Sequence, residues 1–149
     1  MDICLKARND EEVSRALKLN YNCIVYTKSL NNVLTFIPDQ YISDIDIFSE
    51  NTIIITNDVQ LINKLKNRNM KIAYRVDKPS MNILEYNYFV IEFIPKNIRD
   101  LRFYKGKIYI DNIDNLDTYS KLENLKITGI FTKNLDFIVD VKKLSLYRK

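Results

Sequence analysis

The stretch Thr52-Ile53-Ile54-Ile55-Thr56-Asn57-Asp58 decides the fold of this chain. A short apolar run is followed at once by two residues of the type that cap helices, and residues 59–67 then place leucine and isoleucine on one helical face. A second apolar run, residues 72–74, lies within an expected strand at 70–76. This order predicts a strand, a short helix and a second strand, which is the repeating unit of a parallel sheet.

Apolar runs recur along the chain at a spacing of roughly 18 to 20 residues, with centres near residues 54, 73, 90, 109 and 130. That spacing leaves room for one strand, one short helix and two tight turns. The runs are continuous, as in strands that are buried on both faces. The sequence therefore predicts a series of βα units.

The N-terminal part follows the same pattern, with a strand at 2–5, a helix at 10–19 capped by Asn9 and a strand at 22–27. Residues 28–50 are the least regular, with a turn at Pro38-Asp39 and a short accessory strand at 45–48. The remaining expected strands are 52–56, 70–76, 88–94, 107–110, 127–131 and 137–141, and further helices begin at Pro79 and span about 116–125.

Seven or eight mostly parallel short strands separated by short helices predict an α/β protein. The expected architecture is a contracted TIM-like (β/α) barrel, since the usual eightfold barrel needs roughly 250 residues. It forms a single domain over residues 1–149 with a short basic C-terminal tail at 142–149. An open doubly wound sheet is the alternative, and the even spacing favours the barrel.

The absence of some residue types from the sequence excludes several kinds of catalytic and binding site. The chain has no histidine and only two glycines. Imidazole bases, Ser–His and Cys–His nucleophile pairs and histidine metal ligands are therefore excluded. Neither glycine lies in a phosphate-binding loop, so no Rossmann or P-loop fingerprint is present and no cofactor is predicted.

The two cysteines and the N-terminal residues bear on the cellular compartment in which we expect the protein. Cys4 and Cys23 lack metal-ligand spacing and lie in expected strands, so we expect buried free thiols in a reducing compartment. No apolar stretch reaches the roughly 20 residues of a membrane span. The acidic and polar N-terminus does not have the pattern of a secretory signal.

A carboxylate-only Mg²⁺ site is the one catalytic arrangement that the residues leave open. Glu92 is its sharpest candidate, because it lies inside an apolar run and shares a sheet face with Val90. Asp58 is better explained as a helix cap. The full set of candidate acids is Asp2, Asp58, Asp77, Glu92 and Asp111.

The net charge of +4 comes entirely from the second half of the chain. Residues 1–74 carry nine basic and nine acidic side chains, whereas residues 75–149 carry fourteen and ten. Residues 99–109 interleave basic and aromatic side chains, a pattern that suits phosphate contact with base stacking. A helix-to-strand connection with core aromatics is the alternative interpretation.

Several stretches, taken in order, resemble a known family. They are 2–5, 16–26, 45–58, 71–76, Pro79 and 89–93. Together they resemble the thirty-kilodalton protein subunit of eukaryal and archaeal ribonuclease P and ribonuclease MRP. The resemblance covers about residues 1–95, with Asn20 where glycine is usual. Beyond it, the family's basic helix is reduced to 102–106 and its C-terminal Arg-Gly-Pro-Tyr motif has no counterpart.

The resemblance implies a PHP-like barrel without the histidine-rich metal site, because RNA is the catalyst of that ribonucleoprotein. It implies a non-catalytic RNA-binding subunit that supports precursor-tRNA 5′ processing. The implied partners are the catalytic RNA, a small ferredoxin-like protein subunit and other ribonuclease P proteins, without a membrane. The implied location is the nucleus or nucleolus.

Basic residues of the second half are the expected RNA contacts, with one tyrosine as a stacking residue. They are Arg75, Lys78, Lys96, Arg99, Arg102, Tyr104, Lys105, Lys107, Lys142 and Lys143. Two alternatives remain open at this point: a degenerate barrel that acts as a protein-interaction module, and a carboxylate-only Mg²⁺-dependent phosphoesterase.

Overall fold

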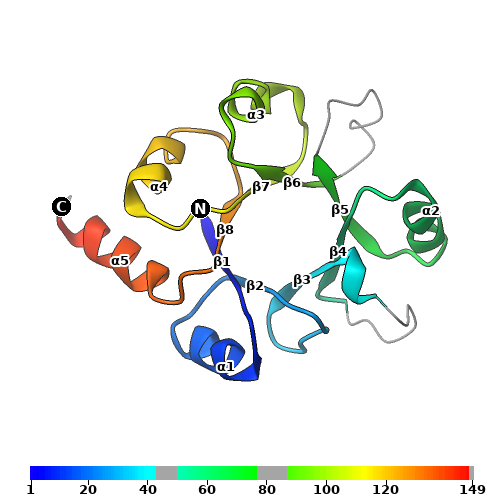
Figure 1. Cartoon of the computed structure of the whole chain (residues 1–149), viewed down its shortest axis with the longest axis horizontal. Coiled ribbons are helices and arrows are strands. Elements are labelled where there is room, and N and C mark those ends of the chain that lie inside the picture. Colours follow the sequence, from blue (N-terminus) through cyan, green and yellow to red (C-terminus); the bar gives the residue numbers. More distant parts are fainter. Residues whose placement is uncertain (43–49, 77–86, 148–149) are drawn as a thin grey trace.

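Eight parallel strands close into a barrel in the computed structural model, which describes residues 1–42, 50–76 and 87–147. Figure 1 looks into the ring of strands, with the helices outside it. The strands are β1 (Asp2–Lys6), β2 (Cys23–Val25), β3 (Leu34–Pro38), β4 (Thr52–Thr56), β5 (Lys71–Val76), β6 (Tyr88–Glu92), β7 (Lys107–Asp111) and β8 (Gly129–Thr132). The contracted TIM-like barrel is therefore confirmed, and an open doubly wound sheet is excluded.

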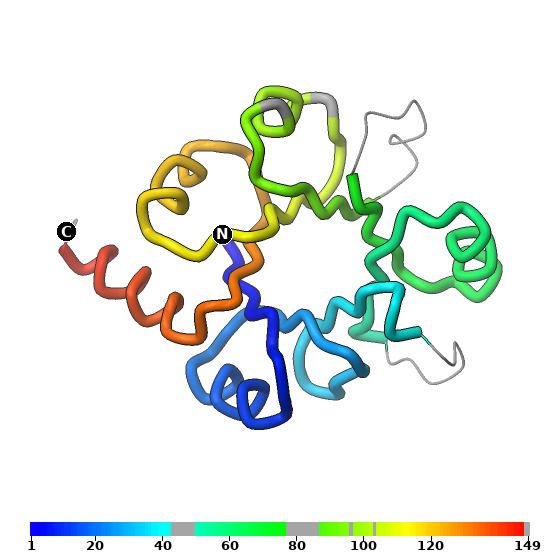
Figure 2. Tube along the Cα trace, in the orientation of Figure 1, coloured from blue at the N-terminus to red at the C-terminus, as the bar shows by residue number. Residues whose placement is uncertain are grey.

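Each strand pairs in parallel with its sequence neighbour, and β1 pairs with β8 to complete the ring. The register places Ile3 opposite Ile130 and Cys4 opposite Phe131. Figure 2 shows the blue N-terminal strand beside the orange strand near the other end of the chain. The strands have three to six residues each, which is how so short a chain closes a barrel.

Short helices follow most strands: α1 (Asp10–Lys18), η1 (Asp39–Tyr41), α2 (Val59–Asn67), α3 (Pro95–Arg99), η3 (Leu101–Phe103), α4 (Leu116–Leu122) and α5 (Phe137–Tyr147). The expected caps are present. Asn9 Oδ1 accepts from the Glu12 backbone N–H at 2.9 Å, and Asp58 Oδ1 accepts from that of Gln60 at 3.0 Å. Among the described residues, no helix is long and apolar enough to cross a membrane.

Alternate side chains of each strand fill the barrel lumen, while the others pack beneath the helices. The centre of the lumen is aromatic: the ring centroids of Phe36 and Tyr109 lie 4.8 Å apart, and those of Phe36 and Phe131 lie 5.0 Å apart. All three residues are almost fully buried. The lumen is therefore a packed core with no passage between the two ends, as in larger barrels of this class.

Two expectations about the strands are wrong. Residues 137–141 lie in α5, where Phe137 and Ile138 are buried, and do not form an eighth strand. The missing strand is β3, within the stretch expected to be irregular. Its Pro38 lacks a backbone N–H, but it stands at the strand end, where parallel pairing tolerates it. The expected strand at 45–48 and the helix beginning at Pro79 lie outside the described residues.

The expectation of two free thiols is also wrong, because Cys4 and Cys23 form a disulfide. The two residues are register partners on β1 and β2, and their Cα atoms are 4.5 Å apart. Both side chains point into the lumen and are fully buried. Sequence spacing alone does not reveal this pairing, since it depends on the register of two neighbouring strands.

Candidate nucleic-acid interface and barrel mouth

The two ends of the barrel carry different sets of polar side chains. Because all strands are parallel, every strand begins at one end and finishes at the other. Lysines stand at the first positions of β5 and β7. Lysine, glutamate and aspartate stand at the last positions of β1, β6 and β7.

A hollow of about 450 Å³ lies at the N-terminal end, between the starts of β5, β6 and β7. Lys71, Tyr88 and Lys107 line it, together with Asn87 and Gly106. The Lys107 ammonium lies 5.6 Å from the centroid of the Tyr88 ring, within the range of a cation–π contact. The hollow therefore combines two exposed ammonium groups with one half-buried aromatic ring.

A second hollow, of about 410 Å³, adjoins the first at Gly106. It lies beside η3 and the segment before β8, and its cations are Arg102 and Lys126. The described residues that line the two hollows thus include four cations and no carboxylate. We call Lys71, Tyr88, Arg102, Gly106, Lys107 and Lys126 the N-terminal basic surface.

Gly106 allows this surface to form. A Cβ atom at this position would lie 2.8 Å from the carbonyl oxygen of Asn87 and 3.1 Å from the ring of Phe89. The backbones before β6 and β7 therefore approach more closely than a side chain would permit. The Lys107 N–H donates to the same Asn87 carbonyl at 2.8 Å, which holds the start of β7 in place.

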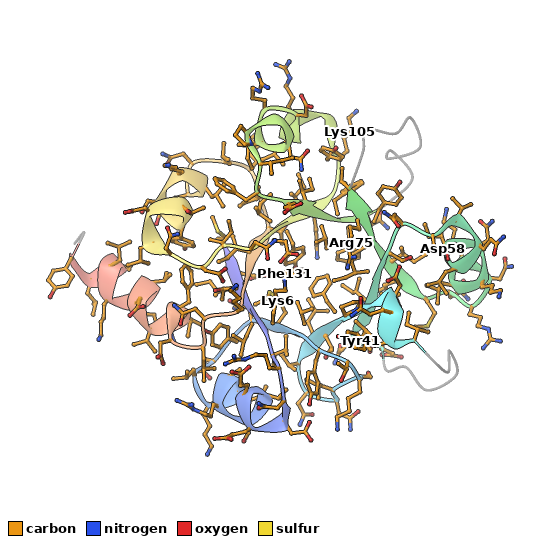
Figure 3. The ribbon with its side chains drawn as sticks, viewed as in Figure 1. Lys6, Tyr41, Asp58, Arg75, Lys105 and Phe131 are labelled. Carbon is orange, nitrogen blue, oxygen red and sulfur yellow. A yellow bond between two sulfur atoms is a disulfide. The ribbon has the colours of Figure 1, made fainter. Side chains whose placement is uncertain are left out.

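The structure brings together only some of the residues expected to contact RNA. Arg102 and Lys107 belong to the N-terminal basic surface, and the exposed Lys105 lies between them in the chain (Figure 3). Arg99 is exposed at the end of α3. Lys71, Tyr88 and Lys126 were not among the sequence candidates. Their one signal is a position at or just before the start of a buried strand.

Three other candidates lie away from this surface, and Tyr104 lines the second hollow only as a buried ring. Arg75 lines the hollow at the opposite end of the barrel. Lys142 and Lys143 are exposed on α5, where Lys142 Nζ donates to the Leu19 carbonyl at 3.4 Å. Tyr104 is only 9 % exposed and packs against Phe89 with ring centroids 5.2 Å apart. In this structure it therefore presents no open ring face to a base. Lys78 and the side chain of Lys96 lie outside the described residues.

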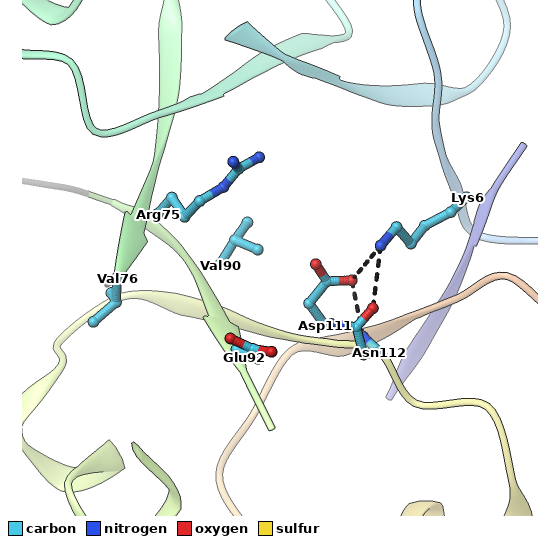
Figure 4. A pocket seen from close by; sticks show the side chains of 7 residues that line it. All are labelled: Lys6, Arg75, Val76, Val90, Glu92, Asp111 and Asn112. Carbon is cyan, nitrogen blue, oxygen red and sulfur yellow. Dashed lines mark hydrogen bonds and ion pairs between the residues drawn. The ribbon is translucent and has the colours of Figure 1, made fainter. Parts of the chain in front are cut away.

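The C-terminal mouth is a charged hollow of about 320 Å³ (Figure 4). Four charged side chains line it among the described residues: Lys6, Arg75, Glu92 and Asp111, from β1, β5, β6 and β7. Val90 also lines the hollow, so Glu92 and Val90 share the lumen face of β6, as the sequence predicts. These described side chains comprise two cations and two carboxylates, so their charges sum to zero.

One ion pair in the mouth is already formed. Lys6 Nζ lies 3.1 Å from Asp111 Oδ1 and donates to Asn112 Oδ1 at 3.3 Å (Figure 4). The Asn112 N–H donates back to Asp111 Oδ1 at 2.8 Å. Asn112 has φ 63°, a left-handed conformation that asparagine tolerates better than most residues. This turn fixes the end of β7 and orients the Lys6–Asp111 pair.

The candidate Mg²⁺ ligands do not form one cluster. Asp2 begins β1 at the N-terminal end, Asp58 caps α2, and Glu92 and Asp111 are neighbours in the mouth. Asp77 lies outside the described residues. Within the described part of the chain, no three acidic or cysteine side chains come close enough to hold a metal ion.

Comparisons with known proteins identify no relative. No protein-family model matches the chain, and neither the curated proteins nor the solved structures contain a match.

Proposed function

We propose that this chain is a non-catalytic RNA-binding protein subunit of ribonuclease P that supports the 5′ processing of precursor tRNA. The observation that supports the proposal best is the N-terminal basic surface, with four cations and no carboxylate among its described lining residues. The resemblance over residues 1–95 is the reason for proposing ribonuclease P as the particle to which the chain belongs. The same resemblance extends the proposal to ribonuclease MRP.

The N-terminal basic surface suits an RNA backbone. Lysine and arginine neutralise phosphates and release counterions, which supplies most of the sequence-independent affinity. Lys71 and Lys107 are anchored on strands, so their positions along a phosphate chain are set by the barrel. The half-buried Tyr88 ring beside Lys107 offers an edge or face to a base or sugar.

The partners in this proposal are the catalytic RNA, a small ferredoxin-like protein subunit and other ribonuclease P proteins. The proposed location is the nucleus or nucleolus. Structural disulfides are rare in that compartment. The redox state of Cys4 and Cys23 in the cell therefore tests the proposed location: free thiols support it and a disulfide argues against it. Alkylation of free thiols at the moment of cell lysis, followed by mass spectrometry, measures that state directly.

Binding to ribonuclease P RNA as a function of salt tests the proposed surface. We expect log K to fall linearly with log salt concentration, and each of Lys71→Gln, Arg102→Gln and Lys107→Gln to reduce the slope by about 1. Lys64→Gln, on the exposed face of α2, is the matched control and keeps the slope. Equal slopes for all four variants would place the RNA elsewhere.

Copurification tests whether the chain is part of a ribonuclease P particle. A tagged copy of the chain is expected to recover a structured RNA together with ribonuclease P proteins, and the Arg102→Gln/Lys107→Gln double variant to recover less of the RNA. Recovery of proteins without RNA, unchanged by salt or by these substitutions, would support the protein-interaction module. Recovery of neither RNA nor ribonuclease P proteins contradicts the proposal.

A further inference from the structure

Two charged side chains of the C-terminal mouth have no partner among the residues that the structure describes. Lys6 is neutralised by Asp111, whereas neither Arg75 nor Glu92 has a side-chain hydrogen bond or ion pair with any other described residue. Figure 4 shows both side chains at the rim of the same hollow, with no interaction joining them. A guanidinium and a carboxylate that no other described side chain neutralises therefore face one small cavity.

The strand register explains why the two groups remain apart. Arg75 is the register partner of Val90, so Glu92 stands two residues further along the same face of β6. The small side chain of Val90 separates them in the lining. With parallel strands about 4.8 Å apart and a rise of about 3.3 Å per residue, positions related in this way lie about 8 Å apart in Cα distance. A ligand that carries an anionic and a cationic group a few bonds apart can contact both at once.

The floor of the mouth is solid. The buried rings of Tyr109 and Phe131 stack below it with centroids 5.5 Å apart. A ligand therefore rests at the mouth and cannot enter the lumen. The volume of about 320 Å³ lies at the lower end of the range for small-molecule sites, and the C-terminal ends of barrel strands are where such sites form.

We propose that the C-terminal mouth binds a small zwitterion of the amino-acid class, with its carboxylate on Arg75 and its ammonium group on Glu92. The planar guanidinium matches a carboxylate through two parallel hydrogen bonds. An ionised Glu92 only accepts hydrogen bonds, so it requires a donor such as an ammonium group. The charges of the four described side chains sum to zero, which favours a neutral ligand over a phosphate dianion, because the two carboxylates would repel the dianion.

This inference does not depend on the proposed RNA function, because the N-terminal basic surface lies at the other end of the barrel. The sequence-based expectation that Arg75 contacts an RNA phosphate is the alternative to this inference. The two ideas predict different ligands for the same side chain: a zwitterion in one case, and a phosphate group alone in the other.

Titration calorimetry of the whole chain with single α-amino acids, inorganic phosphate and ribose 5-phosphate tests the inference. We expect millimolar or tighter binding of at least one amino acid and much weaker binding of the two phosphates. Arg75→Gln and Glu92→Gln are each expected to weaken amino-acid binding about tenfold or more. Lys64→Gln is the matched control, and thermal unfolding verifies that each variant is folded.

The variants also test separately the contact of Arg75 with the ligand's carboxylate and that of Glu92 with its ammonium group. Glu92→Gln is expected to keep weak binding of acetate, and Arg75→Gln to keep weak binding of methylamine. Binding of phosphate but of no amino acid overturns the inference in favour of a phosphate contact. Amino-acid binding that both substitutions leave unchanged, or no binding of any zwitterion by the wild-type chain, also overturns it.

Discussion

At the scale of single residues, Glu12 links the first strand to the first helix. Its carboxylate accepts from the Arg8 backbone N–H at 2.9 Å and from Arg8 Nη2 at 2.8 Å. These hydrogen bonds, chiefly those from the Arg8 side chain, hold the pKa of the Glu12 carboxyl below its ordinary value. The sequence predicts this helix start through the Asn9 cap. The Arg8 contact becomes visible only once β1 and α1 are placed.

A lowered pKa stabilises the folded state above the pKa of a free glutamate, about 4.3, and this contribution is lost as the pH falls further. We expect Glu12→Gln to reduce the free energy of unfolding at pH 7 by about 1 kcal/mol, since Arg8 is largely exposed. The loss should shrink towards pH 3. Urea unfolding at several pH values measures it, with Glu11→Gln as the control. A loss that is equal at pH 7 and pH 3 contradicts this origin.

Tyr21 contributes to stability with the opposite dependence on pH, because the fold raises its pKa. Its buried hydroxyl donates to the Leu135 carbonyl and accepts from the Ile138 N–H at 3.4 Å. Burial is the main cause that raises the pKa of Tyr21 to about 12. The neutral phenol therefore stabilises the fold fully below about pH 10, the pKa of a free tyrosine, and this contribution is lost as the pH rises through about 12.

We expect Tyr21→Phe to cost about 1–3 kcal/mol at pH 7, because the Leu135 carbonyl and the Ile138 N–H lose a partner. The variant should also lose part of the alkaline destabilisation between about pH 10 and 12. Unfolding free energies over this range measure the effect, and Tyr147→Phe, at an exposed position, is the control. An alkaline profile identical to that of the wild type would refute the assignment.

At the scale of elements, Gly129 allows β8 to lie beside β1. A Cβ atom at this position would lie 2.7 Å from the Asp2 carbonyl oxygen and 3.0 Å from the Tyr109 ring. The closest of these neighbours is backbone and cannot move aside. We expect Gly129→Ala to lower the free energy of unfolding by about 1–3 kcal/mol, with Lys133→Ala just after the strand as the control. Unchanged stability would mean that the two strands separate easily.

The disulfide joins β1 to β2. Cys4 and Cys23 are 19 residues apart, and closing a loop of about this length stabilises a fold by about 3 kcal/mol. Reduction should therefore lower the unfolding midpoint of the wild-type chain and leave that of Cys4→Ala/Cys23→Ala unchanged. Thermal unfolding with and without reductant measures both. Two titratable thiols in the unreduced, denatured protein would rule out the bond.

The sequence predicts elements where the local pattern is strong. Residues 59–67 form the expected helix, and the Asn9 and Asp58 caps are present, because capping and periodicity are local properties. The prediction failed for 137–141, where a mostly apolar run, interrupted by Asp140, forms part of a helix. A short apolar run by itself does not distinguish a buried strand from a buried helix. Strand β3 was missed because its proline suggested a turn.

At the scale of the whole molecule, the two proposed sites lie at opposite ends of a barrel whose lumen is filled by Phe36, Tyr109 and Phe131. Rigid close packing separates them, and no described residue lines both. We therefore expect a saturating amino acid at the mouth to leave RNA affinity unchanged. Filter binding with and without the amino acid measures this. Competition between the two ligands would contradict the separation of the sites.

The sequence by itself determined the βα repeat, the helix caps, the excess of positive charge in the second half and the absence of histidine chemistry. These are properties of neighbouring residues and of composition. The tertiary structure alone decided that β1 pairs with β8, that Cys4 meets Cys23, and that Arg75 and Lys107 lie at opposite ends. The physical reason is that strand register and closure depend on residues far apart in the chain, which no local pattern specifies.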